Sequence, residues 1–368
     1  MPPPSGGSGP GDLLTAFAAS IPGPHGLDLD PNVILTNLGL TAFFVFLFAL
    51  TSEVFNSTLD ENREEISAWW ARMMAGPLRI LRPVAFADAG LGRLSESGRV
   101  GGILYALVVM LLVGFIYGFL SPDFGFNEKS LLLVVAFMVG IGFITYLVAG
   151  ATTFLARRRH GAKASVRIYG TAVIVSIIAV IFSRLLSLTP GLVYGFVASA
   201  LILTPLALAK RDEALLVLIP AGLLLAASLA AFVLLGPASD SAQMEALSPS
   251  FLQTILAIVF IAGLESLVFT MLPLRFMHGA VVMKWSKVAW ALVFGGAVFL
   301  WWQLLLNRDQ EYVNSFRQSS VQVVVAGLIV FMGVTGVTWL FFRFHVKEED
   351  AAELELAHAA GEGEAIEL

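Results

Sequence analysis

Cysteine is absent from the 368 residues, and charged residues are scarce. Without cysteine the chain forms no disulfide, binds no metal through thiolates and has no cysteine nucleophile. Charged residues make up 13% of the chain, against about 25% in ordinary soluble proteins, whereas hydrophobic residues make up 57%. The mean hydropathy is +0.83. This composition is typical of an integral membrane protein.

Motifs for catalysis and metal binding are also missing. The sequence contains no G-x-S-x-G nucleophile elbow, no H-E-x-x-H zinc motif and no P-loop G-x-x-x-x-G-K. We therefore predict no enzyme activity and no cofactor. A metal site is not expected either, because the histidines do not stand at metal-ligand spacing from one another: His25, His160, His278, His345 and His358.

The N-terminal segment has no basic residue ahead of its first apolar run, Leu13 to Ile21. This run is too short to span a bilayer, and a cleaved signal peptide is not expected. Residues 1–32 are rich in proline and glycine, which predicts a flexible leader.

Long apolar runs fill most of the remaining chain. A hydrocarbon core about 30 Å thick needs about 20 mostly apolar residues per helix. Nine runs are candidates: Val33–Leu50, Val100–Leu120, Leu131–Leu155, Ile168–Leu186, Leu192–Ala209, Ala214–Leu235, Phe251–Leu274, Val288–Leu306 and Val321–Phe342. The fourth and fifth are separated only by SLTPG, where Pro190 and Gly191 fit a tight hairpin. We therefore predict an all-α membrane helix bundle over residues 33–346, with about nine transmembrane helices.

The distribution of basic residues predicts the orientation of the chain. With nine spans and the N-terminus outside, most of the 22 Lys and Arg residues fall on the cytoplasmic side. Only Lys129, Arg308 and Arg317 remain outside, while Arg184 lies within a span. Because Lys and Arg are enriched in cytoplasmic loops, we predict the N-terminus outside and the C-terminus in the cytoplasm.

The cytoplasmic loop over residues 53–99 contains the pattern of an amphipathic helix. Trp69 and Trp70 lie on its apolar face, and Arg72 lies on its charged face. Such a helix docks on the inner membrane surface or on a partner, or packs under its own bundle. The acidic tail over residues 347–368 is predicted to be solvated, and binding of a cytoplasmic protein is the alternative.

A basic run lies after the third predicted span. It contains Arg157, Arg158 and Arg159. Such a cluster next to a transmembrane helix attracts anionic lipid head groups. We predict a lipid contact here and no binding of nucleic acid.

Glu265 is a carboxylate within an apolar span, where a charge costs roughly 2.5 to 3.5 kcal/mol. Counted from Phe251 at about 1.5 Å per residue, it lies roughly 21 Å along the helix. Arg184 would lie near the outer surface, and Arg275 follows Glu265 with Pro273 placed to kink the helix between them. Neither arginine is a direct partner on this count. Two roles stay open: a proton- or cation-responsive group in a transport path, and a structural glutamate hydrogen-bonded to a neighbouring helix. The lack of a second acid or a counter-charge nearby favours the structural role.

Glycine and proline positions offer a further sign of transport. GFIYG at 114–118 and GLVYG at 191–195 place Gly at i and i+4, and Pro205 and Pro220 flank the KRDE turn at 210–213. Such residues unwind helices around transport sites. They more often allow helices to pack closely, and no inverted repeat aligns here.

The segment GLESLVFTMLPLRFMHG, residues 263–279, resembles the conserved stretch of bacterial, mainly actinobacterial, polytopic membrane proteins named for an FGLLP motif. Here the motif reads Phe269-Thr270-Met271-Leu272-Pro273, which matches the Phe, the second Leu and the Pro but not the Gly and the first Leu. SEVFNSTLDENREEI and SRLLSLTPGLVYG are similar to the same group. The resemblance implies a bacterial plasma membrane location and no particular activity. Threonine in place of glycine puts close helix packing at position 270 in doubt.

The sequence thus favours a non-enzymatic anchor or assembly subunit of the bacterial cytoplasmic membrane. Its partners would be the lipid bilayer with its anionic head groups, a cytoplasmic protein and, as a further option, a second copy of the chain. The alternative is a small-solute or proton-coupled transporter that uses Glu265.

Overall fold

The computed structural model describes residues 30–63, 66, 99–121, 124–186, 188, 191–203, 208–240, 248–306 and 319–341. In these ranges the chain is predominantly helical, and six helices are long and apolar enough to cross a membrane. The chain is accordingly an integral membrane protein. The predicted leader up to residue 29, the acidic tail and the loop residues Trp69, Trp70 and Arg72 lie outside the described ranges.

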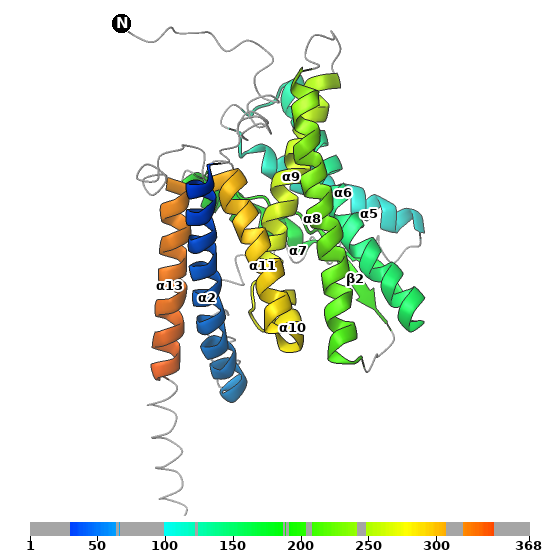
Figure 1. Ribbon diagram of the computed structural model, residues 1–368. Coiled ribbons are helices and arrows are strands. Elements are labelled where there is room, and N and C mark those ends of the chain that lie inside the picture. Colours follow the sequence, from blue (N-terminus) through cyan, green and yellow to red (C-terminus); the bar gives the residue numbers. More distant parts are fainter. Residues whose placement is uncertain are drawn as a thin grey trace, which may run out of the picture. The chain divides into compact units, whose positions relative to one another are not determined.

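The elements follow one another as shown in Figure 1. Helices alternate with two short strands in the middle of the chain. In order they are α2 (Pro31–Glu61), α5 (Arg99–Gly118), α6 (Glu128–His160), β1 (Ala164–Ile168), α7 (Thr171–Leu185), β2 (Ala198–Ile202), α8 (Lys210–Asp240), α9 (Ser248–Thr270), α10 (His278–Trp285), α11 (Lys287–Trp301), the π-helical turn η2 (Trp302–Leu306) and α13 (Ser319–Phe341).

The contacts divide the chain into two compact units. The first contains residues 1–45 and 81–323, and the second contains residues 46–80 and 324–368. In the second unit the later part of α2 packs against α13, where Phe331 stacks on Phe48 and meets Phe55 edge to face. The candidate site described below lies entirely within the first unit.

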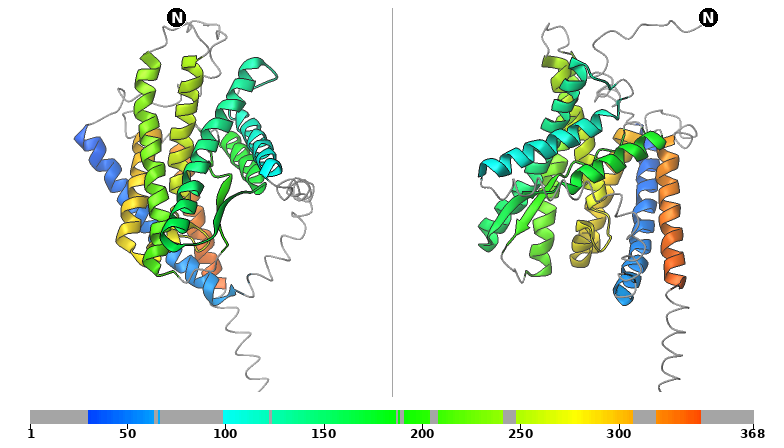
Figure 2. Two further views of the ribbon diagram at one scale, coloured as in Figure 1. Left: turned by 90° about the vertical axis from the view of Figure 1, so that its right-hand side faces the viewer. Right: turned by 180° about the vertical axis from the view of Figure 1, so that it is seen from behind.

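Helix α9 is the centre of the first unit. It packs against α6, α8 and α11, and α8 and α9 lie side by side in both views of Figure 2. In the most apolar stretch of α9, 72% of the residues are buried inside the protein, against 39% in α8. Protein therefore surrounds α9 more completely than the other candidate spans. Gly263 permits this packing, because a Cβ there would overlap the Ser228 hydroxyl of α8. Small residues at helix interfaces let membrane helices approach closely.

Local sequence signals define several helix ends. The Asn127 side chain accepts a hydrogen bond from the Ser130 N–H at 2.8 Å and caps the start of α6. Ser286 caps α11 in the same way through the Ala289 N–H, at 3.2 Å. These caps satisfy N–H groups that have no partner within the helix. The basic last turn of α6 complements the negative end of its helix dipole.

The prediction of a fifth helical span over residues 192–209 is wrong. Residues 191–197 form no helix, and β2 follows them and pairs antiparallel with β1, with Ser199 opposite Arg167. A short apolar run with glycine and β-branched residues fits an extended chain as well as a helix, and periodicity cannot separate the two. Contacts with residues distant in sequence decide the conformation here.

Other predicted spans change in length, and the count of nine is not confirmed. The fourth is a helix of only 15 residues, α7. The seventh ends at Thr270, so Pro273 lies beyond the helix and does not kink it between Glu265 and Arg275, which corrects that expectation. Proline cannot continue a helix and is common just after one ends.

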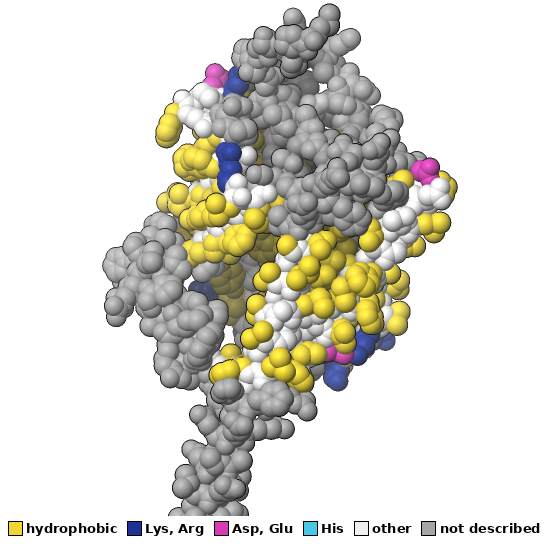
Figure 3. All heavy atoms as spheres, turned by 90° about the vertical axis from the view of Figure 1, so that its left-hand side faces the viewer, with side chains coloured by type: hydrophobic (Ala, Val, Ile, Leu, Met, Phe, Trp, Pro, Cys, Tyr) yellow, Lys and Arg dark blue, Asp and Glu magenta, His cyan; other side chains and the backbone are white. Residues whose placement is uncertain are grey.

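The surface in Figure 3 carries broad areas of hydrophobic side chains, while Lys and Arg appear in a few separate patches. Many large apolar side chains of the spans are exposed, among them Phe43, Phe46, Ile103, Phe154 and Leu292. A soluble protein would not expose such extended apolar surface, whereas a bilayer covers it.

Candidate functional site

A non-helical segment, residues 191–197, runs through the interior of the first unit between α7 and β2. Its residues alternate between fully and partly buried, as in an extended chain. One of its neighbours is Thr145, near the middle of the 33-residue span α6. The segment therefore lies beside the middle of a candidate membrane span, and at such a depth in a bilayer each unpaired backbone group costs several kcal/mol.

Side chains from four helices satisfy the backbone of this segment. Four successive N–H groups donate to side-chain oxygens: Leu192 to Ser183 Oγ at 2.8 Å, Val193 to Glu265 Oε2 at 2.7 Å, Tyr194 to Tyr117 Oη at 3.0 Å and Gly195 to Ser266 Oγ at 2.7 Å. These partners come from α7, α9 and α5. From α6, the Thr145 hydroxyl donates to the Gly195 carbonyl at 2.7 Å and accepts from the Val197 N–H at 3.3 Å. The sequence thus provides a specific acceptor for each of these buried donors.

Glu265 is one of these acceptors. Its side chain is 2% exposed, and Val193, whose N–H it accepts, is 1% exposed. The indole of Trp301 is a second hydrogen-bond partner of the same carboxyl group. Both partners are donors, so the geometry suits an oxygen that accepts hydrogen bonds. The partner from the segment is an extended backbone, whereas the sequence pattern suggested a neighbouring helix.

The other three intramembrane candidates lie apart from this carboxylate. Arg184 Nε and Nη2 donate to the carbonyls of Phe119 and Ser121, at 2.8 and 2.9 Å, which satisfies the chain just after the end of α5. Arg275 is exposed, and Pro273 is buried in the turn that follows α9. The four candidates therefore form no common cluster.

The turn after α9 folds tightly back on itself. The Trp290 indole donates to the Met271 carbonyl at 2.8 Å, and Trp290 stacks on Phe294 within α11. Gly279, at the start of α10, lies so close to Met271 that an added Cβ would overlap its carbonyl group. This turn places His278 beside the end of α9.

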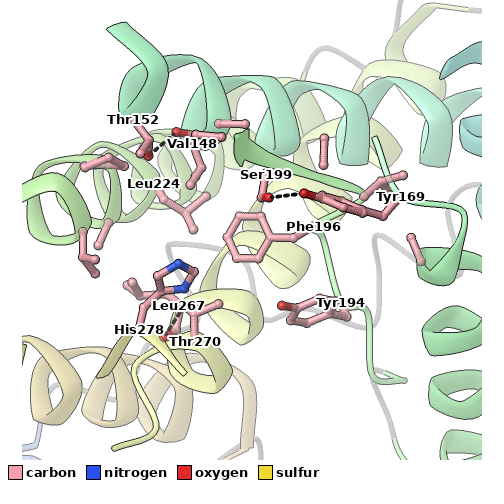
Figure 4. Close-up of a pocket in the computed structure, with 18 of the residues that line it drawn as sticks. Val148, Thr152, Tyr169, Tyr194, Phe196, Ser199, Leu224, Leu267, Thr270 and His278 are labelled. Carbon is pink, nitrogen blue, oxygen red and sulfur yellow. Dashed lines mark hydrogen bonds between the residues drawn. The ribbon is translucent and has the colours of Figure 1, made fainter. Parts of the chain in front are cut away.

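A cavity of about 490 Å³ lies next to the non-helical segment (Figure 4). Its walls come from α6, α7, α8, the end of α9, the start of α10 and residues 194–202. The lining is mostly aliphatic and aromatic, and it includes no Asp, Glu, Lys or Arg. Glu265 does not line the cavity, but it hydrogen-bonds to Val193, which precedes the wall residue Tyr194.

Polar groups in the cavity wall fall into two kinds. Thr152 and Thr270 donate to carbonyls of their own helices, and the hydroxyls of Ser199 and Tyr169 face each other at 3.4 Å. In contrast, three side chains of the wall make no side-chain hydrogen bond with any residue that the structure describes: Thr171, Tyr194 and His278. Figure 4 shows the side chains of Tyr194 and His278 directed toward the cavity.

The surroundings of His278 favour its neutral form. Its side chain is exposed in part to the cavity and the surface, and desolvation by the neighbouring protein lowers the pKa of His278 from its ordinary value of 6.5. A neutral imidazole has one hydrogen-bond donor and one acceptor.

The basic run in the last turn of α6 contains Arg157, Arg158 and Arg159. Arg157 donates through Nε to the Ala164 carbonyl at 2.7 Å and so holds the start of β1. Arg158 and Arg159 are exposed in the last turn of α6. Their contact with anionic lipid head groups stays a prediction. No cluster of three or more His, Asp or Glu that could hold a metal occurs among the described residues.

The sequence singled out Glu265 because an ionisable residue is rare in an apolar span. It did not single out the other side chains that hydrogen-bond to the non-helical segment. Thr145, Ser183, Ser266 and Tyr117 are polar residues within apolar spans, which is the only signal that could have identified them. Their shared partner, the backbone of the non-helical segment, was assigned to a helix. The chain matches no family model, no curated protein and no solved structure.

Proposed function

We propose that this integral membrane protein takes a small molecule into the cavity beside the non-helical segment, as a membrane carrier or ligand-binding protein. The observation that carries the proposal is the cavity itself, which is partly open, lies between candidate membrane helices and is walled on one side by non-helical backbone. Mostly apolar cavities with a few convergent polar groups are typical ligand sites.

The non-helical wall supports this function over that of a simple anchor. Backbone that is not helical is tolerated at membrane depth only where protein buries it or where it lines a cavity, and discontinuous segments of this kind form substrate sites in transporters. Buried side chains from four helices hold this segment in place. A pure anchor needs no such arrangement.

Glu265 supports the site without facing it. The transporter predicted from the sequence used this carboxylate as the coupling group, yet here it accepts hydrogen bonds from Val193 and Trp301 away from the cavity wall. In our proposal Glu265 fixes the wall, and the cavity residues contact the bound molecule.

The anchor role remains a second proposal for the segments outside the described ranges. Trp69, Trp70, Arg72 and the acidic tail are the surfaces that would bind a cytoplasmic partner. The resemblance to the FGLLP-motif group and the composition support a bacterial plasma membrane location.

The predicted orientation, N-terminus outside, also remains a proposal. Strands β1 and β2 are hydrogen-bonded neighbours, so the part of the chain that connects them begins and ends at the same place. This connection takes the place of the fourth and fifth predicted spans. Because two spans are removed together, the predicted orientation of every other span in the membrane stays the same.

Binding of an uncharged fluorescent hydrocarbon, diphenylhexatriene, tests the proposed function. With purified protein in nanodiscs, and with empty nanodiscs subtracted, we expect a saturable component of one dye per chain. Ala221→Trp places a large ring in the cavity wall and should abolish this component. Ala226→Trp on the exposed face of the same helix is the matched control and should retain it. Lack of saturable binding, or equal binding by the two variants, would contradict the proposal.

A further inference from the structure

The cavity lining determines the charge of the molecule that fits it. None of its lining residues is Asp, Glu, Lys or Arg, and desolvation lowers the pKa of its one histidine, His278. An ion inside an apolar cavity needs a counter-charge, and without one its desolvation cost is prohibitive. The occupant is therefore uncharged.

Two of the polar side chains that lack a partner, those of Tyr194 and His278, point into the cavity and can hydrogen-bond with an occupant. The Tyr194 hydroxyl comes from the non-helical segment and the His278 imidazole from the start of α10. Neither side chain has a hydrogen-bond partner among the described residues; Tyr194 is half-buried and His278 is exposed, so both groups are free to bond with an occupant. Both present N–H or O–H donors, which a carbonyl or ester oxygen would satisfy.

The remaining walls are suited to an apolar body. Phe196 and Tyr194 meet edge to face at 5.6 Å on one side, and aliphatic residues of α8, among them Leu216, Val217 and Leu224, line another. Aromatic faces of this kind contact flat rings and methylene chains favourably.

We propose that the cavity binds an uncharged amphiphile whose oxygen acceptors hydrogen-bond with Tyr194 and His278. This inference rests on the proposed function, because it assigns a ligand class to the same cavity. A prenylated quinone and a neutral glyceride share this chemistry: each has carbonyl oxygens and an apolar tail.

Displacement of bound diphenylhexatriene by defined compounds tests the inference. Decylubiquinone and dioctanoylglycerol are the two uncharged acceptors, and their relative affinities distinguish the quinone source from the lipid source. Decane supplies the apolar tail alone, and decanoate at pH 8 supplies a charged oxygen. We expect at least one of the uncharged acceptors to displace the dye at least tenfold more strongly than decane or decanoate.

Two variants connect this preference to the named residues. Tyr194→Phe and His278→Leu each remove one hydrogen-bonding group and should weaken the acceptor compound about tenfold while leaving dye binding unchanged. Tyr146→Phe, on an exposed part of α6, is the control and should change neither. If the dye binds but acceptors have no advantage over decane, or if both variants bind them normally, the inference is overturned and the proposed function stands. If no dye binds saturably, the proposed function itself has failed.

Discussion

Replacement of Glu265 tests whether this carboxylate holds the non-helical segment. Glu265→Leu introduces an apolar side chain of similar size and removes the acceptor of the N–H of Val193, a residue that is 1% exposed. A buried donor left without a partner costs about 1 to 3 kcal/mol. The same substitution also leaves the Trp301 indole without this partner. Glu265→Gln keeps an acceptor oxygen at the same reach, so its loss should stay below about 1 kcal/mol.

The assay is reversible unfolding in mixed micelles, followed by circular dichroism, for the wild type and both variants. Ser266→Ala is a matched variant, because it removes the acceptor of another buried backbone donor of the same segment, the Gly195 N–H. The serine that it replaces carries no charge. It should lose a similar amount, about 1 to 3 kcal/mol. A Leu variant as stable as the wild type, or equal losses in Gln and Leu, would refute the structural role. Replacing a buried ionisable group by an apolar one is sometimes stabilising, so this outcome is a real alternative.

Three further predictions concern other contacts of the first unit. Gly279→Ala should lower the free energy of unfolding by at least about 2 kcal/mol, because the new Cβ overlaps the Met271 carbonyl; chemical unfolding measures this, and a neutral result would contradict the tight turn. Thr145→Val removes two hydrogen bonds to the non-helical segment and should cost about 2 kcal/mol in the same experiment, whereas an unchanged stability would argue against that docking. The free energy of unfolding should fall as the pH drops below 6.5, the ordinary pKa of histidine. Below this pH the unfolded chain binds a proton at His278. The folded chain, in which the pKa of His278 is lowered, binds this proton only at lower pH. Thermal unfolding between pH 8 and pH 5 should show this trend in the wild type and a smaller one in His278→Asn; identical trends would rule out His278 as the cause.

Apolar run length predicted most of the spans correctly, because the bilayer sets a minimum helix length that composition alone reveals. The first, third and sixth predicted spans are the apolar parts of α2, α6 and α8. Their ends were less accurate, since they depend on local contacts. The turn after Thr270 is one case, where Pro273 ends the helix instead of bending it.

The non-helical segment could not be predicted from its own residues. GLVYG fits a packed helix or an unwound one, and both interpretations were open. The choice depends on acceptors contributed by Tyr117, Thr145 and Glu265, which lie 52 to 77 residues from their partners along the chain. Only Ser183 is near in sequence. Glu265 was conspicuous because a charge in an apolar span is rare, whereas hydroxyl groups in such spans are common and give little signal. The cavity residue His278 gave none, because its neighbours are assembled only by the fold.

The most direct test of the account is a disulfide between Arg167→Cys and Ser199→Cys in intact membranes, which the absence of native cysteine makes unambiguous. These positions face each other in the β1–β2 pair, and the non-helical segment must lead directly into that pair. We expect this pair to cross-link under mild oxidation, and Arg167→Cys with Ala200→Cys to fail because adjacent strand residues point to opposite faces. In a helical fifth span ending at Ala209, residue 199 would lie roughly 15 Å inside the bilayer, far from Arg167. Failure of the Arg167–Ser199 pair to cross-link would contradict the non-helical segment and the cavity that it walls.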